Sequence, residues 1–230
     1  MSRFKTPWRT TLLKRTALIA TLALASMHAS ANLVTSRAAL GGNDFIDWGQ
    51  LGASFDFPSN PVSVNSNLGL AAGVGKPTSG SFLLLNSTDH GGNLGGNILS
   101  TFFEAGPITI DFGVGLAKIG AQIQSNDFGA FNGVISAFDS ANILLETWSF
   151  GGDSNGDQDN SGIFIGISRS TADIDHVTFN ITGPNNLDFA INRVDLNRTP
   201  DQINQTPEPA SLALAGLSLA ALLATRRRKR

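Results

Sequence analysis

The strongest candidate for a ligand site is an acidic stretch past the middle of the chain, at 153–160. Oxygen-bearing side chains recur there at every second position, namely Asp153, Asn155, Asp157 and Asp159. Carboxylate and amide oxygens are the ligands that Ca²⁺ prefers, and a curling loop can point such alternating oxygens at one ion. The match to an EF-hand fails, because Gln158 stands where glycine makes the sharp turn and Phe164 where a bidentate Glu completes the coordination. A calcium site and a solvated loop both stay open, and we favour the loop.

Aromatic side chains offer a second kind of site, because sugar-binding modules stack aromatic faces on pyranose rings. Between the two ends of the chain the only tryptophans are Trp48 and Trp148, and tyrosine is absent from the whole sequence. Either tryptophan could serve as a sugar platform. Tryptophan side chains are also highly buried on average, so a place in the core is the alternative.

Hydrolytic chemistry has little support in the sequence. The histidines of the central region are His90, beside Asp89 in a glycine-rich stretch, and His176, on a predicted strand. Neither a Gly-x-Ser-x-Gly nor a His-Glu-x-x-His pattern is present. Glu104 and Glu146, the only glutamates outside the C-terminal tail, fall at or near predicted strand ends. We expect no enzymatic activity, with a secreted hydrolase kept as a further alternative.

The elements that must position these residues are predicted to be strands. Apolar and polar residues alternate, as at 174–182, where Val177, Phe179 and Ile181 are separated by polar side chains. No stretch between the two ends of the chain keeps a helical period. The sequence therefore predicts an all-β domain, an antiparallel β-sandwich of jelly-roll type. Strands are expected at 53–57, 62–65, 81–86, 97–104, 107–112, 117–125, 131–139, 142–150, 163–168, 174–182 and 187–196.

The connections between these strands carry their own signals. Ala105-Gly106 and Ser140-Ala141 each separate two strands and predict hairpins. The apolar parity of the last strand shifts between Ile191 and Val194, as a β-bulge would cause. We also expect a loose lead-in at 32–43, a flexible glycine-rich loop at 89–97 and a strand at 81–86 that is buried on both faces.

Charge is distributed unevenly along the chain. Ten of the 16 Lys and Arg residues lie in the two terminal segments, whereas 17 of the 18 acidic residues lie between them. The central region thus has six basic against 17 acidic residues, a net charge of about −11. Such a surface repels nucleic acid and anionic lipid. Cysteine is absent, so disulfides, thiolate chemistry and cysteine-based metal sites are excluded.

The N-terminal segment has the three parts of a secretory signal peptide. A basic region is followed by an apolar run at 17–27 and by the small-x-small sequence Ala29-Ser30-Ala31. We predict a signal-peptide helix over residues 1–31 that is removed during export, so that the mature chain begins at Asn32. An uncleaved first transmembrane helix is the alternative.

The C-terminal segment also has three parts in a fixed order. Pro207, Glu208 and Pro209 precede an uncharged run at 210–224. At about 1.5 Å per residue this run covers roughly 22 Å, a minimal span for a hydrocarbon core of about 30 Å. A stop-transfer cluster follows and would keep the C-terminus on the cytoplasmic side. It consists of Arg226, Arg227, Arg228, Lys229 and Arg230.

This three-part tail resembles the PEP-CTERM sorting signal of Gram-negative, biofilm-forming bacteria. The resemblance implies that exosortase, a membrane enzyme, recognises the Pro207-Glu208-Pro209 region and processes the tail after Sec-dependent export. An ordinary single-pass anchor is the alternative. The body resembles the galactose-binding-like sandwich domains found in many PEP-CTERM proteins, through the segments GPITIDF at 106–112, FGAF at 128–131, IFIGI at 163–167 and DFAINR at 188–193. In related modules an Asp near a structural calcium stands where this chain has Asn192.

The sequence therefore predicts a signal peptide at 1–31, a β-sandwich at 32–198, a linker at 199–206 and a sorting tail with a single transmembrane helix at 207–230. The precursor is expected in the inner membrane, and the processed protein at the cell surface or in the extracellular matrix. A structural or adhesive role is what the resemblance implies. A module that binds exopolysaccharide is the first alternative. No cofactor other than Ca²⁺ is considered, and no nucleic-acid partner is expected.

Overall fold

The computed structural model describes residues 31–90, 94–155, 157, 159, 161–183 and 188–204. The predicted sorting tail and all of the predicted signal peptide except Ala31, the first residue of β1, lie outside these residues. The elements are β1 (Ala31–Val34), α2 (Arg37–Leu40), β2 (Asp44–Ile46), the 3-10 helix η1 (Trp48–Leu51), β3 (Val62–Asn65), β4 (Ala71–Gly75), β5 (Leu83–Asn86), β6 (Asn97–Ser100), β7 (Ile108–Leu116), β8 (Lys118–Ser125), β9 (Gly129–Phe138), β10 (Leu144–Ser154), β11 (Ile163–Arg169), β12 (Ile174–Thr182), β13 (Phe189–Asn197) and α3 (Pro200–Asn204).

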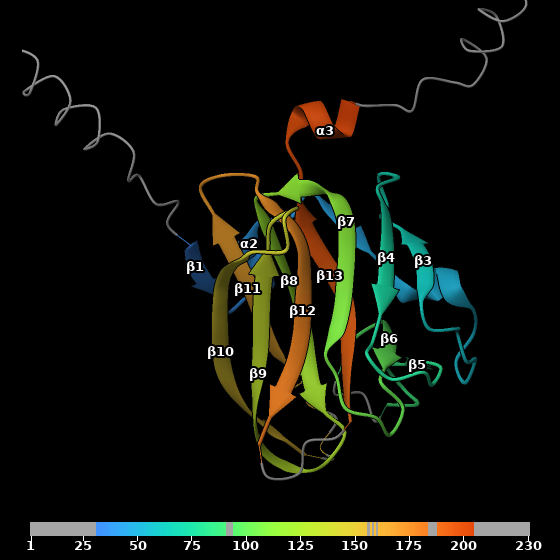
Figure 1. Cartoon of the computed structure of the whole chain (residues 1–230). Helices are drawn as coiled ribbons and strands as arrows, with labels where there is room; N and C mark the ends of the chain where they lie inside the picture. The colour runs from blue at the N-terminus through green and yellow to red at the C-terminus, as the bar shows by residue number, and fades with distance from the viewer. Residues whose placement is uncertain are drawn as a thin grey trace, which may run out of the picture. The chain divides into compact units, whose positions relative to one another are not determined.

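The strands form two antiparallel sheets. Sheet A has the order β1-β11-β8-β13-β6-β5, with β2 also paired to β13, and sheet B has the order β10-β9-β12-β7-β4-β3. Figure 1 shows β9, β12 and β7 of sheet B in front of β8 and β13 of sheet A. The predicted all-β architecture with antiparallel sheets is confirmed.

The core lies between the two sheets and follows from the alternation read in the sequence. In β12 the inward side chains of Val177, Phe179 and Ile181 are buried. Burial of each such side chain stabilises the fold by about 1.5 to 3 kcal/mol. The predicted bulge in β13 is also confirmed, because its register with β8 shifts between Ile191 and Val194.

The lead-in at 32–43 that was expected to be loose, and a glycine-rich run for which no strand was predicted, both contain regular structure. The lead-in forms β1 and the short helix α2, which the Ser36 hydroxyl caps by accepting a hydrogen bond from Ala39 N at 3.2 Å. The glycine-rich run before residue 80 contains β4, which pairs with β3 and β7. Strand pairing therefore overrides the low intrinsic preference of glycine and alanine for strands.

The strand expected at 53–57 is wrong. Phe55 has a φ of 69°, which a strand does not allow, and the Asp56 carboxylate accepts a hydrogen bond from Ala53 N at 2.7 Å to close a turn. The segment still bonds to the edge of β5, because Phe55 N donates to Leu84 O at 2.8 Å and Leu84 N to Asp56 O at 2.9 Å. An irregular segment thus covers the edge strand of sheet A.

The hairpin expected at Ala105-Gly106 is also wrong, because β6 and β7 belong to different sheets. The residues between them cross one end of the sandwich from sheet A to sheet B. The strand at 81–86 was expected to be buried on both faces, but β5 is buried on one face only. Leu84 is buried in the core, but Leu83 and Leu85 on the outer face of sheet A are only half-buried. This crossover and this outer face together form the site described next.

Candidate functional site

A pocket of about 290 Å³ lies on the outer face of sheet A, where β5, β6 and β8 end near the crossover. Its volume is close to the lower end of the range for small-ligand sites, roughly 300 to 1,000 Å³. Apolar and polar side chains from six separate stretches of sequence line it. They are Leu83, Leu85, Asp89, His90, Ser100, Phe102, Phe103, Gln124, Ser125, Asn126, Phe128, Ser154 and Asp188.

Two consecutive phenylalanines of the crossover have a strained backbone. Phe102 and Phe103 have φ values of 56° and 58°, in the left-handed region that bulky side chains avoid. This conformation costs about 1 to 2 kcal/mol per residue. The strain persists because the surrounding structure holds the loop, and such outliers gather at functional sites.

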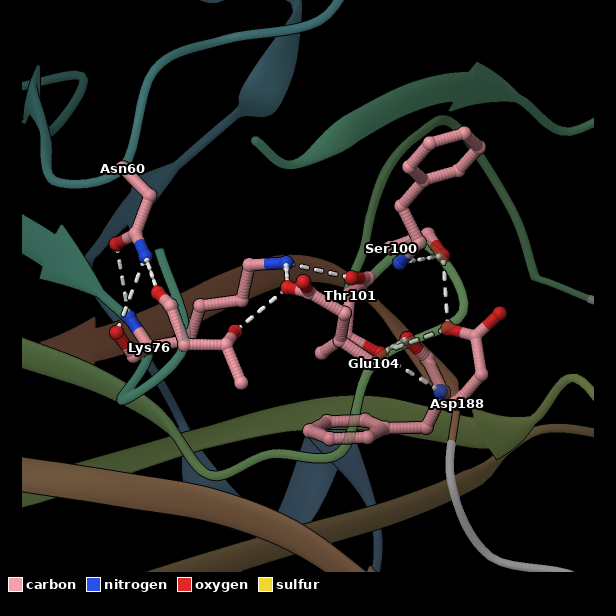
Figure 2. Close-up of polar contacts among 9 residues, drawn as sticks. Asn60, Lys76, Ser100, Thr101, Glu104 and Asp188 are labelled. Atoms are coloured by element: carbon pink, nitrogen blue, oxygen red, sulfur yellow. Dashed lines mark hydrogen bonds and ion pairs between the residues drawn. The ribbon is translucent and has the colours of Figure 1, made fainter. Parts of the chain in front are cut away.

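Lys76 is the residue that holds the loop on both sides of the strained pair. Its side chain is fully buried, and its ammonium group donates to Thr101 O at 2.7 Å and forms an ion pair with Glu104. Glu104 also accepts a hydrogen bond from Thr78 Oγ1 at 2.6 Å. Figure 2 shows Lys76 reaching the loop between Thr101 and Glu104. Hydrogen bonds from Lys76 and Thr78 keep the pKa of Glu104 below its ordinary value.

Asp188 fixes the other side of the loop at the start of β13. Its Oδ1 accepts hydrogen bonds from Thr101 Oγ1 at 2.7 Å and from Ser100 Oγ at 3.3 Å. Figure 2 shows that the other carboxylate oxygen points away from these two hydroxyls. Asp188 therefore organises the loop with one oxygen, and its second oxygen makes no contact with the residues drawn there.

Two amide side chains in the pocket wall have an unpartnered oxygen. Gln124 Nε2 donates to Ser154 Oγ at 3.1 Å, and Asn126 Nδ2 donates to Ser100 Oγ at 3.1 Å. Gln124 Oε1 and Asn126 Oδ1 are buried, and within the described part of the chain neither accepts a hydrogen bond. A buried polar atom without a partner costs about 1 to 3 kcal/mol, which a bound donor would recover.

The orientation of both amides follows from the hydroxyls that they contact. Ser154 donates its only hydroxyl hydrogen to Ser125 O at 2.7 Å, so it can only accept from Gln124. Ser100 likewise donates to Asp188 and accepts from Asn126. In each case the NH₂ group must face the serine. The oxygen is therefore the end of each amide that has no described hydrogen-bond partner.

Phenylalanines form the apolar rim of the pocket. Phe103 is 81% exposed and Phe128 is 68% exposed, which is unusual for side chains of this size. Phe102 lies 5.1 Å from Phe103 and 5.1 Å from Phe57 between ring centroids. The rim thus presents aromatic rings beside polar oxygens, an arrangement suited to a ligand with an apolar face and several hydrogen-bond donors.

His90 and Asp89 lie at the mouth of the pocket, on the segment that follows β5. Burial lowers the pKa of His90 below its ordinary value, an effect that the nearby Asp188 carboxylate opposes. The imidazole is therefore neutral at pH 7 and offers one N–H donor. Asp89 is exposed and accepts a hydrogen bond from Ser54 Oγ. Asp89 and His90, neighbours in the glycine-rich stretch noted in the sequence, thus both line the pocket.

The acidic stretch singled out in the sequence begins at the end of β10, where Ser154 lines the pocket, and two of its four predicted ligand side chains accept hydrogen bonds from backbone N–H groups two residues further on. Asp153 is exposed on β10, opposite Ala130. Asn155 Oδ1 accepts from Asp157 N at 2.9 Å, and Asp159 Oδ1 accepts from Ser161 N at 3.0 Å. Hydrogen bonds from Ser161 hold the pKa of Asp159 below its ordinary value. No group of three or more His, Cys, Asp or Glu side chains suited to a metal ion occurs among the described residues.

The two tryptophans point into the sandwich. Trp48 is fully buried, and its Nε1 donates to Asn192 O at 3.0 Å, so no ring face is open to a sugar. Trp148 lies on β10 opposite the buried Ile135, and its half-buried ring packs against the core. The exposed aromatic rings are those of phenylalanines, which the sequence analysis did not consider as platforms.

The remaining predicted residues do not join one site. His176 stacks on Phe138 on the outer face of sheet B, with ring centroids 4.8 Å apart. Glu104 is part of the Lys76 contact, whereas Glu146 lies on β10. Asn192, at the position of the calcium-linked Asp of related modules, accepts hydrogen bonds from Arg37 at 3.1 Å and Gln122 N at 3.2 Å. Its side-chain oxygen is therefore occupied by protein donors.

The domain is similar to several solved structures at low sequence identity. It is similar to a DUF4465 family protein from Bacteroides caccae, with 11% identity and a TM-score of 0.37 over 73% of this chain and 100% of the other. It is similar to CsCBM6-3 from Clostridium stercorarium, solved with cellobiose, with 16% identity and a TM-score of 0.30 over 51% and 82%. A glycoside hydrolase family 43 arabinoxylan arabinofuranohydrolase from Bacillus subtilis has 18% identity and a TM-score of 0.33 over 64% and 28%. These similarities concern the fold alone.

Sequence comparison identifies the C-terminal segment. Residues 205–229 match the PEP-CTERM protein-sorting motif, which confirms the predicted resemblance. No curated protein sequence matches the chain. Within the described residues no helix is both long and apolar enough to span a membrane, and the run at 210–224 lies outside them.

Proposed function

Because the chain carries a PEP-CTERM sorting motif, which marks an exported protein that exosortase processes, we propose that its β-sandwich is an adhesive module of the cell surface or extracellular matrix. In this proposal the sandwich binds exopolysaccharide, and the ligand enters the pocket on the outer face of sheet A. The module has no catalytic role.

The pocket oxygens are the observation that carries this proposal. Gln124 Oε1 and Asn126 Oδ1 are buried acceptors without a partner in the described structure. Sugars supply many hydroxyl donors, and the faces of their rings pack on aromatic side chains. Phe103 and Phe128 stand exposed beside these acceptors. A polysaccharide unit therefore matches both the polar and the apolar parts of the pocket.

A binding experiment with purified components tests the proposal. The exported protein is titrated with exopolysaccharide fragments from its native host, and the heat of binding is measured. Phe103→Ala should weaken binding about fivefold to tenfold, because it removes an aromatic contact worth about 1 kcal/mol or more. Phe150→Ala, on β10 of sheet B, is the matched control, since Phe150 is exposed but does not line the pocket. Equal affinity of both variants and the wild type would contradict a role for the pocket.

The sorting part of the proposal has its own test. Intact mass and membrane fractionation are compared between cells with and without exosortase. We expect a mature form that starts near Asn32 and lacks the Arg226–Arg230 cluster only where exosortase is present. A full-length tail that stays in the membrane in both strains would instead indicate an ordinary anchor.

A further inference from the structure

The polar atoms of the pocket are nearly all hydrogen-bond acceptors. Gln124 Oε1 and Asn126 Oδ1 have no donor in the described structure. The hydroxyls of Ser100 and Ser154 give their single hydrogens to Asp188 and Ser125 O, so they cannot donate to a ligand. What remains for a ligand is a set of oxygens, with few hydrogens to offer in return.

The fixed charge of the pocket has one sign. The carboxylates of Asp89 and Asp188 both line it, and among the described residues no lysine or arginine does. Asp188 is buried, with 8% of its surface exposed, so its charge is poorly screened by solvent. His90, neutral at pH 7, does not balance these charges. A uronic acid or a sulfated sugar would be repelled from such a pocket.

We propose that the pocket recognises a sugar unit that carries a primary ammonium group, such as an unacetylated hexosamine. This proposal rests on the glycan-binding function proposed above. An ammonium group has three donors and no acceptor, which complements Gln124 Oε1, Asn126 Oδ1 and the Asp188 carboxylate. Hydrogen bonds between charged groups are about twice as strong as neutral ones. The rings of Phe103 and Phe128 add a surface that attracts a cation.

The test compares two oligosaccharides of the same length and linkage. One is built of glucosamine, and the other of N-acetylglucosamine, which keeps the ring and all its hydroxyls but has an uncharged acetamide in place of the ammonium group. The exported protein is titrated with each by calorimetry. We expect the glucosamine oligomer to bind about tenfold to a hundredfold more tightly, the range for a hydrogen bond to a charged group.

A variant that removes one negative charge from the pocket tests whether the preference for glucosamine arises there. Asp188→Asn keeps the shape of the side chain, and its carboxamide oxygen can still accept from Thr101 Oγ1. It should reduce the preference for the glucosamine oligomer over the acetylated oligomer about tenfold. Asp111→Asn is the matched control, because it makes the same charge change on β7 of sheet B. Asp89→Asn, at an exposed position, replaces Asp188→Asn if that variant fails to fold.

The outcomes separate this inference from the function on which it rests. Equal binding of the two oligomers, or a glucosamine preference that Asp188→Asn and Asp89→Asn both leave unchanged, overturns the ammonium proposal and leaves glycan binding standing. Displacement of glucosamine by Ca²⁺ at constant ionic strength would show that the oxygens form an ion site, and would overturn it as well. Failure of every glycan to bind overturns the proposed function itself.

Discussion

Two regions of this domain gather carboxylate and amide oxygens, and they differ in where those oxygens find hydrogen bonds. In the acidic loop at 153–159, Asn155 Oδ1 and Asp159 Oδ1 accept from backbone N–H groups two residues further on. In the pocket, Gln124 Oε1 and Asn126 Oδ1 accept from no described residue. The loop was conspicuous in the sequence, whereas the pocket was not. Buried acceptor atoms without a hydrogen-bond partner therefore indicate a ligand site better than a high density of acidic residues does.

The pocket and the acidic loop also differ in the contacts that hold their backbone in place. The crossover is held at Thr101 and Glu104 by the buried Lys76, and at Thr101 again by Asp188. This support keeps Phe102 and Phe103 in a conformation that phenylalanine avoids. In the acidic loop, Asn155 Oδ1 and Asp159 Oδ1 accept from residues two positions further on, and Ser154 at its start donates to Ser125 O at 2.7 Å. A site that must keep one shape for a ligand needs support from distant parts of the chain.

The largest effect is expected from loss of the Lys76 contact. Lys76→Met keeps the length of the side chain but removes its bond to Thr101 O, so the unfolding free energy should fall by about 1.5 to 3 kcal/mol, the range for a hydrogen bond to a charged group. Urea denaturation measures the change. Lys118→Met on β8 serves as control and should change the unfolding free energy by less than about 0.5 kcal/mol. A similar, small effect of both variants would show that Lys76 does not hold the crossover.

Relief of backbone strain should produce the next largest effect, with the opposite sign. Phe103→Gly replaces a residue at a φ of 58° with one that adopts this conformation freely, so stability should rise by about 0.5 to 1 kcal/mol while glycan affinity falls. Thermal unfolding and calorimetric titration measure the two quantities. Phe128→Gly is the control, because Phe128 is exposed to a similar degree but its φ is not positive. A loss of stability in Phe103→Gly equal to that in Phe128→Gly would exclude stored strain.

Acid should weaken the crossover in a way that depends on Glu104. Its pKa in the folded protein is lowered by Lys76, so its contribution is present above the ordinary value of about 4.3 and is lost as pH falls through the folded value. The stability difference between the wild type and Glu104→Gln should therefore shrink from pH 5 towards about pH 3. Unfolding free energies across this range measure it, with Glu146→Gln as control. A difference that stays constant with pH would contradict the ion pair.

The smallest effect is expected in the acidic loop. Asp157→Asn should change the unfolding free energy by less than about 0.5 kcal/mol, as is usual for exposed positions. We also expect CaCl₂ on the order of 10 mM to raise Tm no more than a sodium salt of equal ionic strength. A calcium-specific rise in Tm that Asp157→Asn abolishes would establish the calcium site and reverse the comparison between the two regions.

Much of the fold was predictable because strand alternation is local. The pattern at 174–182 and the parity shift between Ile191 and Val194 are both found in the structure. The crossover between β6 and β7 was not predictable, because Ala105-Gly106 has the composition of a hairpin turn. Only the pairing of β6 with β13 and of β7 with β12 shows that the chain changes sheets. The strand at 53–57 was wrongly predicted for a similar reason. The positive φ of Phe55 depends on the turn that the Asp56 carboxylate closes.

The candidate site was hardly predictable. Lys76 and Glu104 lie 28 positions apart, and Ser100 and Asp188 lie 88 apart. No sequence motif connects residues at such separations. Asp89 and His90 were noted only as neighbours in a glycine-rich stretch, and Glu104 only as a glutamate near a predicted strand end. The composition contained one indication of the site. The chain has 15 phenylalanines and no tyrosine, so phenylalanine was the aromatic residue to consider as a sugar platform.

In the proposed function the glycan binds in the pocket. It does not bind to the acidic loop or to the outer face of sheet B. A crystal structure of the exported protein with a bound oligosaccharide tests this claim most directly. We expect donor groups of the sugar within about 3.2 Å of Gln124 Oε1 and Asn126 Oδ1, and a sugar ring against Phe103. A sugar bound to another face, with only water or an ion beside the two amide oxygens, would contradict it.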